Sequence, residues 1–481
     1  MTLQHSRGHF TIIRTYRGDS GWAVYQLVHS ASYAHISGST YLLGANKGDF
    51  LSVLERGVRI LRTHGPKVFL QRAAYVVLRP IRIARAEGTR AFAARSFAKA
   101  SSILTPQTAT MLVATEDAEQ LDWTEPAPWQ ADPVSVEQGP VDIAWIMSPP
   151  GLESGGHQNL FRFIDLAEKA GHRCSIYLYT TSSAPVSFTD IRSMLRTAAA
   201  YPEVSASIEM YDRDKGVREG TQAIFATGWE TAYPAYLDKS NARRFYFVQD
   251  YEASFYPLGT ESLLAENTYR FGFHGITAGG WLAHKLSTEF GMTTDHFDFA
   301  ADKTHYSVTN LERRNEVFFY ARPVTARRAF EFGLLVLAEF ARIKPDVRIN
   351  FAGWDVSNWA IPFEHTNLAS LDISELNAVY NRCAAGLVLS LSNMSLLPLE
   401  LLSSGVTPVV NDGPNNRMVS DNPHIEYVQA SPLAIARKMA EVLDHPDAVE
   451  RSVAMSESVA STTWSDSGDQ FLAAFERAMR G

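Results

Sequence analysis

The chain has 481 residues, 46% of them hydrophobic and 20% charged, and a formal net charge of −8. This length predicts two or three domains rather than one, and the composition is that of an ordinary globular protein. Two cysteines, Cys174 and Cys383, are too few for a disulfide framework and are expected to be buried free thiols. No stretch reaches the ~20 apolar residues of a membrane-spanning helix, and the polar first residues argue against a signal peptide.

Residues 1–135 are expected to form an N-terminal extension, in which residues 1–45 show no assignable pattern. Residues 48–100 have apolar side chains at helical spacing with arginines between them, which predicts basic helices. Between residues 51 and 100, eleven Lys/Arg stand against two Glu, a local net charge of +9 that leaves −17 for the remainder. Residues 101–140 are rich in Pro, Thr, Asp and Glu, and this composition predicts a linker.

The basic segment favours an anionic partner. Basic amphipathic helices suit a membrane surface, where each basic residue contributes roughly 1 kcal/mol. The alternative is that these helices pack against the acidic remainder of the chain. Nucleic acid is not expected, because no reading helix or aromatic platform accompanies the charge.

Residues 136–310 alternate between short apolar runs and helical stretches, which predicts a Rossmann-like domain with a parallel sheet. A helix is expected from Gln158 to Lys169. The predicted strands are 141–147, 173–179, 223–226, 244–248 and 275–277.

The alternation restarts in residues 311–481 and predicts a second Rossmann-like domain facing the first, so that the fold class is α/β with a cleft between two halves. Ser431-Pro432 is a typical helix start. The predicted strands are 317–320, 347–352, 386–390 and 406–410.

The segment from Ser392 to Glu400 follows a predicted strand and leads into a helix, with Ser395 as its expected cap and Pro398 in its first turn. Free backbone amides at such a helix start favour an anion. Glu400 could accept two hydrogen bonds from a sugar diol; the alternative is that it complements the helix dipole.

Arg322 directly follows a strand, and Arg327 is predicted to begin the next helix. Two guanidinium groups at the carboxyl edge of a parallel sheet suit a diphosphate, because arginine binds phosphate oxygens in a forked geometry. The alternative is a solvated basic helix start, which the helix dipole disfavours.

In the first half, Gly155-Gly156 lets the backbone approach a ligand closely at a strand-to-helix turn, although the turn lacks the nicotinamide fingerprint. His157 beside it could touch substrate, but a histidine at a helix start is more often structural. Gln249, Asp250 and Tyr251 stand at a strand end, where ligands of open α/β sheets collect, or else belong to a packed loop. Asp212 and Asp214 are taken as a solvated turn, and neither a metal ion nor a cofactor is predicted.

Several of these segments together resemble retaining glycosyltransferases of the GT-B fold, and within them the WsaF-type rhamnosyltransferases of bacterial surface polysaccharide synthesis. The resemblance covers residues 141–443 and leaves the extension unexplained. The segments that carry it, in chain order, are 155–159, 225–233, 246–252, 264–269, 320–323 and 398–400.

The resemblance implies that Arg322 and Arg327 contact the donor diphosphate and that Glu400, the second glutamate of an E-x7-E element, holds the ribose. The first glutamate of that element is replaced by Ser392, which favours an unusual donor sugar such as a 6-deoxyhexose. The implied donor contacts are Gly155, Gly156, Ser392, Ser395, Leu396 and Leu397, and the expected acceptor contacts are His157, Gln249, Asp250 and Tyr251.

The resulting hypothesis is a transferase that moves a sugar, L-rhamnose from dTDP-rhamnose, to a growing cell-surface glycan with retention of configuration. Its partners would be a nucleotide diphosphate sugar and a lipid-linked or polysaccharide acceptor, in the cytoplasm at the inner face of the bacterial membrane. Two alternatives stay open: a nucleotide-sugar epimerase of the same fold, and a non-catalytic glycan-binding or scaffold subunit.

Overall fold

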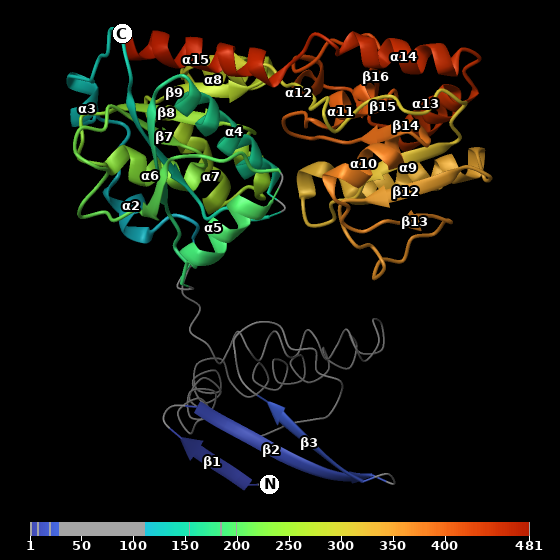
Figure 1. Cartoon of the computed structure of the whole chain (residues 1–481), viewed down its shortest axis with the longest axis horizontal. Helices are drawn as coiled ribbons and strands as arrows, with labels where there is room; N and C mark the ends of the chain where they lie inside the picture. The colour runs from blue at the N-terminus through green and yellow to red at the C-terminus, as the bar shows by residue number, and fades with distance from the viewer. Residues whose placement is uncertain are drawn as a thin grey trace, which may run out of the picture. The chain divides into compact units, whose positions relative to one another are not determined.

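The computed structural model describes residues 2–6, 9–18, 21–27, 111–152, 154–182, 185–198 and 200–480. The chain divides into two compact units, residues 1–108 and 109–481. In the first unit, strands β1 (Thr2–Ser6), β2 (His9–Gly18) and β3 (Gly21–Leu27) pair as an antiparallel sheet (Figure 1). The basic helices predicted for residues 48–100 lie outside the described residues.

The second unit begins with a parallel seven-stranded sheet in the order β10-β9-β8-β7-β4-β5-β6. All five strands predicted for this half are confirmed, whereas the edge strands β6 and β10 were not predicted. The strands are β4 (Asp142–Met147), β5 (Arg173–Leu178), β6 (Ser207–Met210), β7 (Ala223–Ala226), β8 (Arg243–Val248), β9 (His274–Ala278) and β10 (Thr293–Phe297).

Helices connect these strands, as expected for a doubly wound sheet. The predicted helix at Gln158 begins one turn earlier, because Ser154 caps it and accepts a hydrogen bond from the His157 amide. The helices of this half are α4 (Gly155–Lys169), α5 (Phe188–Thr197), α6 (Trp229–Leu237), η1 (Glu252–Phe255), α7 (Thr260–Asn267), η2 (Thr268–Arg270) and α8 (Gly280–Phe290).

A second parallel sheet has six strands in the order β13-β12-β11-β14-β15-β16. The strand order reverses between β11 and β14, and ligands of open α/β sheets bind outside the carboxyl ends of the strands at such a switch point. All four predicted strands are confirmed. The strands are β11 (Glu316–Tyr320), β12 (Arg348–Ala352), β13 (Thr366–Asn367), β14 (Cys383–Val388), β15 (Thr407–Asn411) and β16 (Glu426–Val428).

The helices around the second sheet include α13, whose start at Ser431-Pro432 is as predicted. They are η3 (Ala326–Arg328), α9 (Phe330–Ile343), α10 (Ile373–Tyr380), α11 (Leu397–Ser403), α12 (Pro414–Arg417), α13 (Pro432–Asp444) and α14 (Ala448–Ser458).

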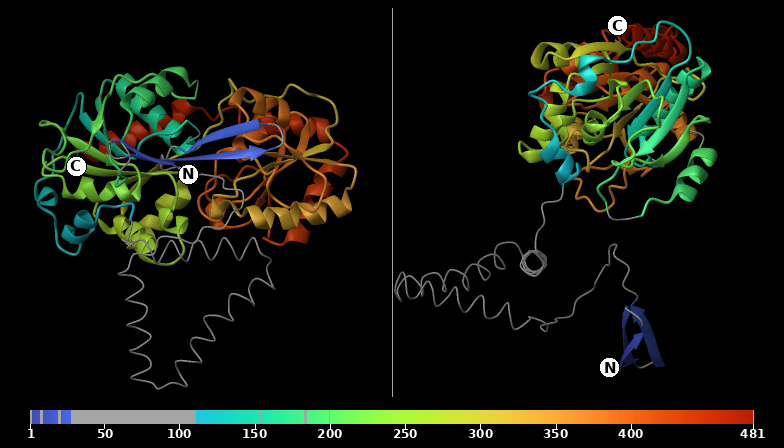
Figure 2. Two further views of the ribbon diagram at one scale, coloured as in Figure 1. Left: turned by 90° about the horizontal axis from the view of Figure 1, so that it is seen from below. Right: turned by 90° about the vertical axis from the view of Figure 1, so that its left-hand side faces the viewer.

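The C-terminal helix α15 (Trp464–Arg480) returns to the first sheet, as Figure 2 shows. Phe471 and Phe475 on this helix pack in the same buried cluster as Trp145 and Phe225 of the first sheet. Residues 464–480, which the sequence assigned to the second half, therefore complete the core of the first half.

The prediction of a linker is wrong for residues 111–131, which pack on the first half through α2 (Thr115–Gln120) and α3 (Pro128–Ala131). Trp129 is buried, and its indole donates a hydrogen bond of 3.1 Å to the Tyr236 carbonyl. Asp117 is buried as well and forms an ion pair of 2.7 Å with Arg213. Single buried residues such as these produce no periodic pattern in the sequence. The polar composition of the segment therefore suggested a linker.

Cys383 is buried and free, as predicted, while Cys174 is half-buried and free. Burial raises the pKa of both thiols to about 12, so both are protonated at neutral pH. In the described part of the chain, none of the helices combines the length and the apolar character needed to cross a membrane.

Candidate functional site

The candidate site lies at the carboxyl edge of the second sheet, beyond the ends of the adjacent strands β11 and β14. Arg322 follows β11 by two residues and is half-buried. Its Nη1 donates to the Gly353 carbonyl at 3.3 Å, and its Cζ lies 5.8 Å from the Tyr320 ring centroid and 5.9 Å from that of Trp354. These two rings remain 36% and 37% exposed, so a cation lies between two accessible aromatic faces.

The prediction that Arg327 begins the next helix is wrong. Arg327 lies on the short turn η3, which precedes α9. Its Nε donates to Asp250 of the first half at 2.9 Å, and its Cζ lies 3.9 Å above the Phe255 ring centroid. Ala329, which follows the turn, has a φ of +47°, a left-handed conformation that is unfavourable for alanine. The backbone is therefore strained at Ala329, directly after the two arginines that approach the other half.

Arg328 is a functional candidate that the sequence analysis missed. Its Nη1 donates to the Ser390 hydroxyl at 2.6 Å and to the Asn393 carbonyl at 3.3 Å. Burial lowers the pKa of Arg328, and the nearby Asp250 opposes that shift. The pair of adjacent arginines, Arg327 and Arg328, was the feature of the sequence that could have indicated it.

The loop between β14 and α11 is held in place by asparagines. Asn415 donates to the Ser390 carbonyl at 3.0 Å and also to the Ser392 carbonyl, and Asn411 donates to the Ser390 carbonyl at 2.9 Å. The Ser392 hydroxyl is buried and has no hydrogen-bond partner among the described residues. The asparagines thus fix the backbone of this loop and leave one buried hydroxyl with an unused hydrogen-bonding capacity.

The prediction that Ser395 caps the following helix is wrong. Helix α11 begins at Leu397, its N-cap is Leu396, and no side chain caps it. Since Leu396 and Leu397 carry no acceptor, the amides at this helix start are not neutralised by a local side chain.

Glu400 lies in α11, and its carboxyl group is enclosed although the residue as a whole is half-buried. Burial raises its pKa to about 7, against the opposing effects of Arg162 and of a hydrogen bond with Tyr380. Arg162 comes from α4 of the first half, where its Cζ lies 3.9 Å above the Trp464 ring centroid. Glu400 thus faces a cation of the opposite half.

On the first half, Gly155 and Gly156 begin α4. Gln249 donates to the Gly156 carbonyl at 3.1 Å and accepts from Asn159 at 3.1 Å, which ties the glycine turn to the end of β8. A Cβ on Gly155 would meet nothing within 4 Å, so its side of the turn is open.

His157 and Tyr251 both have partners within their own half. The ring nitrogens of His157 lie 2.7 Å from the Ser154 hydroxyl and 3.0 Å from the Ser148 carbonyl, and burial lowers its pKa. The Tyr251 hydroxyl donates to Glu266 at 3.2 Å. These contacts fix the positions of both side chains and agree with the structural alternative that the sequence left open for His157, without testing the predicted contact with the acceptor.

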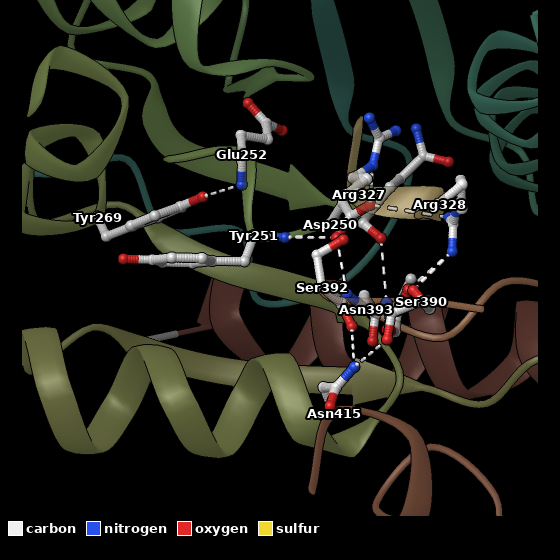
Figure 3. A network of polar contacts seen from close by, with 12 residues as sticks. Asp250, Tyr251, Glu252, Tyr269, Arg327, Arg328, Ser390, Ser392, Asn393 and Asn415 are labelled. Atoms are coloured by element: carbon white, nitrogen blue, oxygen red, sulfur yellow. Dashed lines mark hydrogen bonds and ion pairs between the residues drawn. The ribbon is translucent and has the colours of Figure 1, made fainter. Parts of the chain in front are cut away.

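The structure brings some predicted residues into one network and leaves others apart. Figure 3 shows Asp250, Arg327, Ser392 and Asn393 converging between the two halves, with Arg328 beside them. Arg322 and Glu400 hydrogen-bond elsewhere on the second half. Among the described residues, no group of three His, Cys, Asp or Glu side chains is placed to share a metal ion.

Comparison with known proteins finds a matching family and a relative of known association. Residues 315–440 match the family described as WsaF, C-terminal domain. The chain is 31% identical over 347 residues to the O-antigen biosynthesis protein RfbC of Myxococcus xanthus. The match covers 70% of this chain but only 27% of that relative, so the chain spans about a quarter of its length.

Solved structures share the fold at low sequence identity. A variant of TarM from S. aureus, in complex with fondaparinux, α-GlcNAc-glycerol and UDP, matches with a TM-score of 0.55 and 9% identity over 71% of this chain and all of TarM. A glycosyltransferase from Rickettsia africae matches with a TM-score of 0.52 and 12% identity over 72% of this chain and 100% of its own. The resemblance to WsaF and the GT-B fold expected from the sequence are confirmed.

Proposed function

We propose that this chain, which has a WsaF-like C-terminal domain within a GT-B glycosyltransferase fold, transfers a sugar from a nucleotide diphosphate donor to a cell-surface glycan. One observation carries the proposal: Arg322, Arg327 and Arg328 gather at the switch point of the second sheet, and Arg327 and Arg328 approach Asp250 of the first half. Arginine suits phosphate because its planar fork donates two parallel hydrogen bonds. The relative involved in O-antigen biosynthesis supports a glycan as the acceptor.

In this proposal the donor binds to the second half, and its diphosphate, nucleobase and ribose each contact a different set of residues. The diphosphate lies between Arg322 and Arg327, near the uncapped start of α11. The nucleobase stacks on the exposed faces of Tyr320 and Trp354, and Glu400 accepts the ribose hydroxyls. Leu396 and Leu397 contribute backbone amides, and the Gly155-Gly156 turn approaches from the first half.

The transfer step needs little covalent help from the protein. The bond from the anomeric carbon to the diphosphate oxygen breaks, and the acceptor oxygen forms its bond to that carbon on the same face, with retention. The arginines stabilise the negative charge that develops on the leaving diphosphate. A leaving phosphate oxygen takes the acceptor proton, and closure of the two halves excludes water.

The donor sugar is proposed to be L-rhamnose, supplied as dTDP-rhamnose. The resemblance to WsaF-type enzymes supports this choice, as does Ser392 at a position where the broader family has a glutamate. The acceptor is proposed to lie against Gln249, Asp250, Tyr251 and His157 of the first half.

The test incubates the purified full chain with a panel of nucleotide sugars, with and without an acceptor glycan, and measures release of nucleoside diphosphate. Acceptor-dependent release that falls in Arg322→Ala and Glu400→Gln is expected. Arg342→Ala is the control, because this side chain is 74% exposed and its ion-pair partner among the described residues, Glu339, lies on its own helix.

Two outcomes would refute the proposal in different ways. Isomerised sugar nucleotide without acceptor would identify an epimerase. Glycan binding without any release, unaffected by Glu400→Gln, would identify a scaffold subunit. Equal turnover in both site variants and the wild type would refute the residue assignment alone.

Contact with a membrane through residues 51–100, which lie outside the described residues, also remains a proposal. The charge of this segment supports attraction to anionic lipid. Flotation with phosphatidylglycerol vesicles and not with phosphatidylcholine vesicles is expected; equal recovery with both would refute it.

A further inference from the structure

The carboxylate of Asp250 connects the two halves at the candidate site. Asp250 follows β8 and is only 7% exposed. Within its own half it accepts from the Tyr251 amide at 2.9 Å. From the other half it accepts from the Asn393 amide at 2.9 Å and from Arg327 at 2.9 Å, and it lies 3.9 Å from Arg328 (Figure 3).

The contact with Arg327 uses only one edge of the guanidinium. Asp250 takes Nε, and Phe255 covers one face of the group at 3.9 Å. No described residue accepts a hydrogen bond from Nη1 or Nη2, and the side chain is 25% exposed. A guanidinium is rigid and planar, so fixing Nε and one face fixes the direction of both remaining nitrogens.

The contact between the Asp250 carboxylate and Arg327 exists only when the two halves are closed. Asn393 crosses in the opposite direction, since its Nδ2 donates to the Gln249 carbonyl at 3.1 Å and to the Ala278 carbonyl at 2.8 Å. The turn that carries Arg327 also packs against η1 of the first half. Asp250 can therefore hold Arg327 only while the halves are together.

We propose that Asp250 is a positioning residue that orients Arg327 through Nε, so that Nη1 and Nη2 bind the donor diphosphate only when the two halves close. This inference rests on the proposed function. It assigns to Asp250 an action through Arg327 in place of the direct acceptor contact considered above. It also explains why an arginine stands at this position: lysine lacks the planar fork, so a carboxylate that binds its ammonium group does not fix the direction of donors toward the phosphate.

The experiment measures binding of dTDP and UDP to the full chain by calorimetry, together with donor KM and kcat. Asp250→Asn keeps the shape but replaces one acceptor oxygen with a donor, and it should weaken diphosphate binding by about 10- to 100-fold. Asp250→Glu should restore part of this loss. Asp190→Asn, an exposed carboxylate of the same half, is the control and should bind as the wild type does.

A double-mutant cycle separates positioning from a merely structural role. Arg327→Lys has no Nε for Asp250 to hold, so adding Asp250→Asn to Arg327→Lys should weaken binding little further. Losses that multiply in the double variant would overturn the proposal, as would Asp250→Asn binding dTDP and UDP like the wild type while the wild type turns over donor. A wild-type chain that binds neither diphosphate and releases none would overturn the proposed function, and this inference with it.

Discussion

Glu400 is a carboxyl group whose protonation should control donor binding. Burial raises its pKa to about 7, so the ionised fraction increases as pH rises through neutrality. An ionised carboxylate accepts stronger hydrogen bonds from ribose hydroxyls than a protonated one does. We expect donor KM to fall about tenfold between about pH 6 and pH 8, which steady-state kinetics would measure. A Glu400→Gln variant with the same pH profile would contradict this assignment.

Glu252, the first residue of η1, carries a second buried carboxyl group, which accepts from the amide of Trp229 at the start of α6 at 2.5 Å and from the Tyr246 hydroxyl at 2.9 Å. Burial raises its pKa to about 8, and the neighbouring Glu230 adds to the shift. The folded protein therefore keeps a proton that the unfolded chain loses above its ordinary pKa of 4.5, and the free energy of unfolding should fall as pH rises from about 4.5 to 8.

Glu252→Gln should remove that dependence while keeping an acceptor for the Trp229 amide. At pH 8 we expect the variant to be more stable than the wild type by about 1–3 kcal/mol, with the difference shrinking toward pH 5. Urea denaturation at several pH values would measure it. The exposed Glu219→Gln is the control, and parallel pH curves for Glu252→Gln and the wild type would contradict the expectation.

Individual site residues were predictable only where they stand at strand ends. Arg322 and Asp250 follow apolar runs, so their position at the sheet edge could be inferred from the sequence. That Asp250 binds Arg327 could not be inferred, because 77 residues separate them and only the facing of the two sheets brings them together. Arg328 was missed because its hydrogen-bond partners Ser390 and Asn393 lie 62 and 65 residues further along the chain.

Among the elements, helix α15 packs against the first half, which the sequence did not predict. Phe471 is fully buried and lies 6.2 Å from Trp145 and 5.1 Å from Phe163, measured between ring centroids. Phe471→Ala should lower the free energy of unfolding of the first half by about 3–5 kcal/mol through lost burial and a cavity. Chemical denaturation followed by tryptophan fluorescence would show the change. Leu335→Ala, at a side chain that is 58% exposed, should change it by less than about 0.5 kcal/mol.

The interior strands of both sheets were predicted and several edge strands were not, for a physical reason. Interior strands of a parallel sheet are covered on both faces and form continuous apolar runs. Strand β6 is mostly exposed, and β10 holds polar residues up to Phe297, so neither has an apolar run. The two-residue strand β13 is too short for any pattern to appear.

At the scale of the molecule, the two halves of the second unit are joined by polar contacts between rigid elements. Asn393 enters the carboxyl edge of the first sheet, while Gly279 lies so close to Val419 that an added Cβ would approach it within 3.2 Å. Apolar packing contributes as well, because one buried cluster includes residues of both halves, such as Phe297 and Leu397. The sequence predicted two facing halves but not their contacts, since these depend on three-dimensional placement.

Asn393→Ala should therefore shift the halves toward an open state. It removes two hydrogen bonds to the first half but keeps the backbone amide that Asp250 binds. We expect amides of residues 249–251 and 390–394 to exchange hydrogen about tenfold faster, and saturating dTDP to restore part of the protection. Asn367→Ala is the matched control, because its amide group bonds Asp355 within the second half. If exchange in these two segments is the same for Asn393→Ala as for Asn367→Ala, the contacts of Asn393 do not control closure.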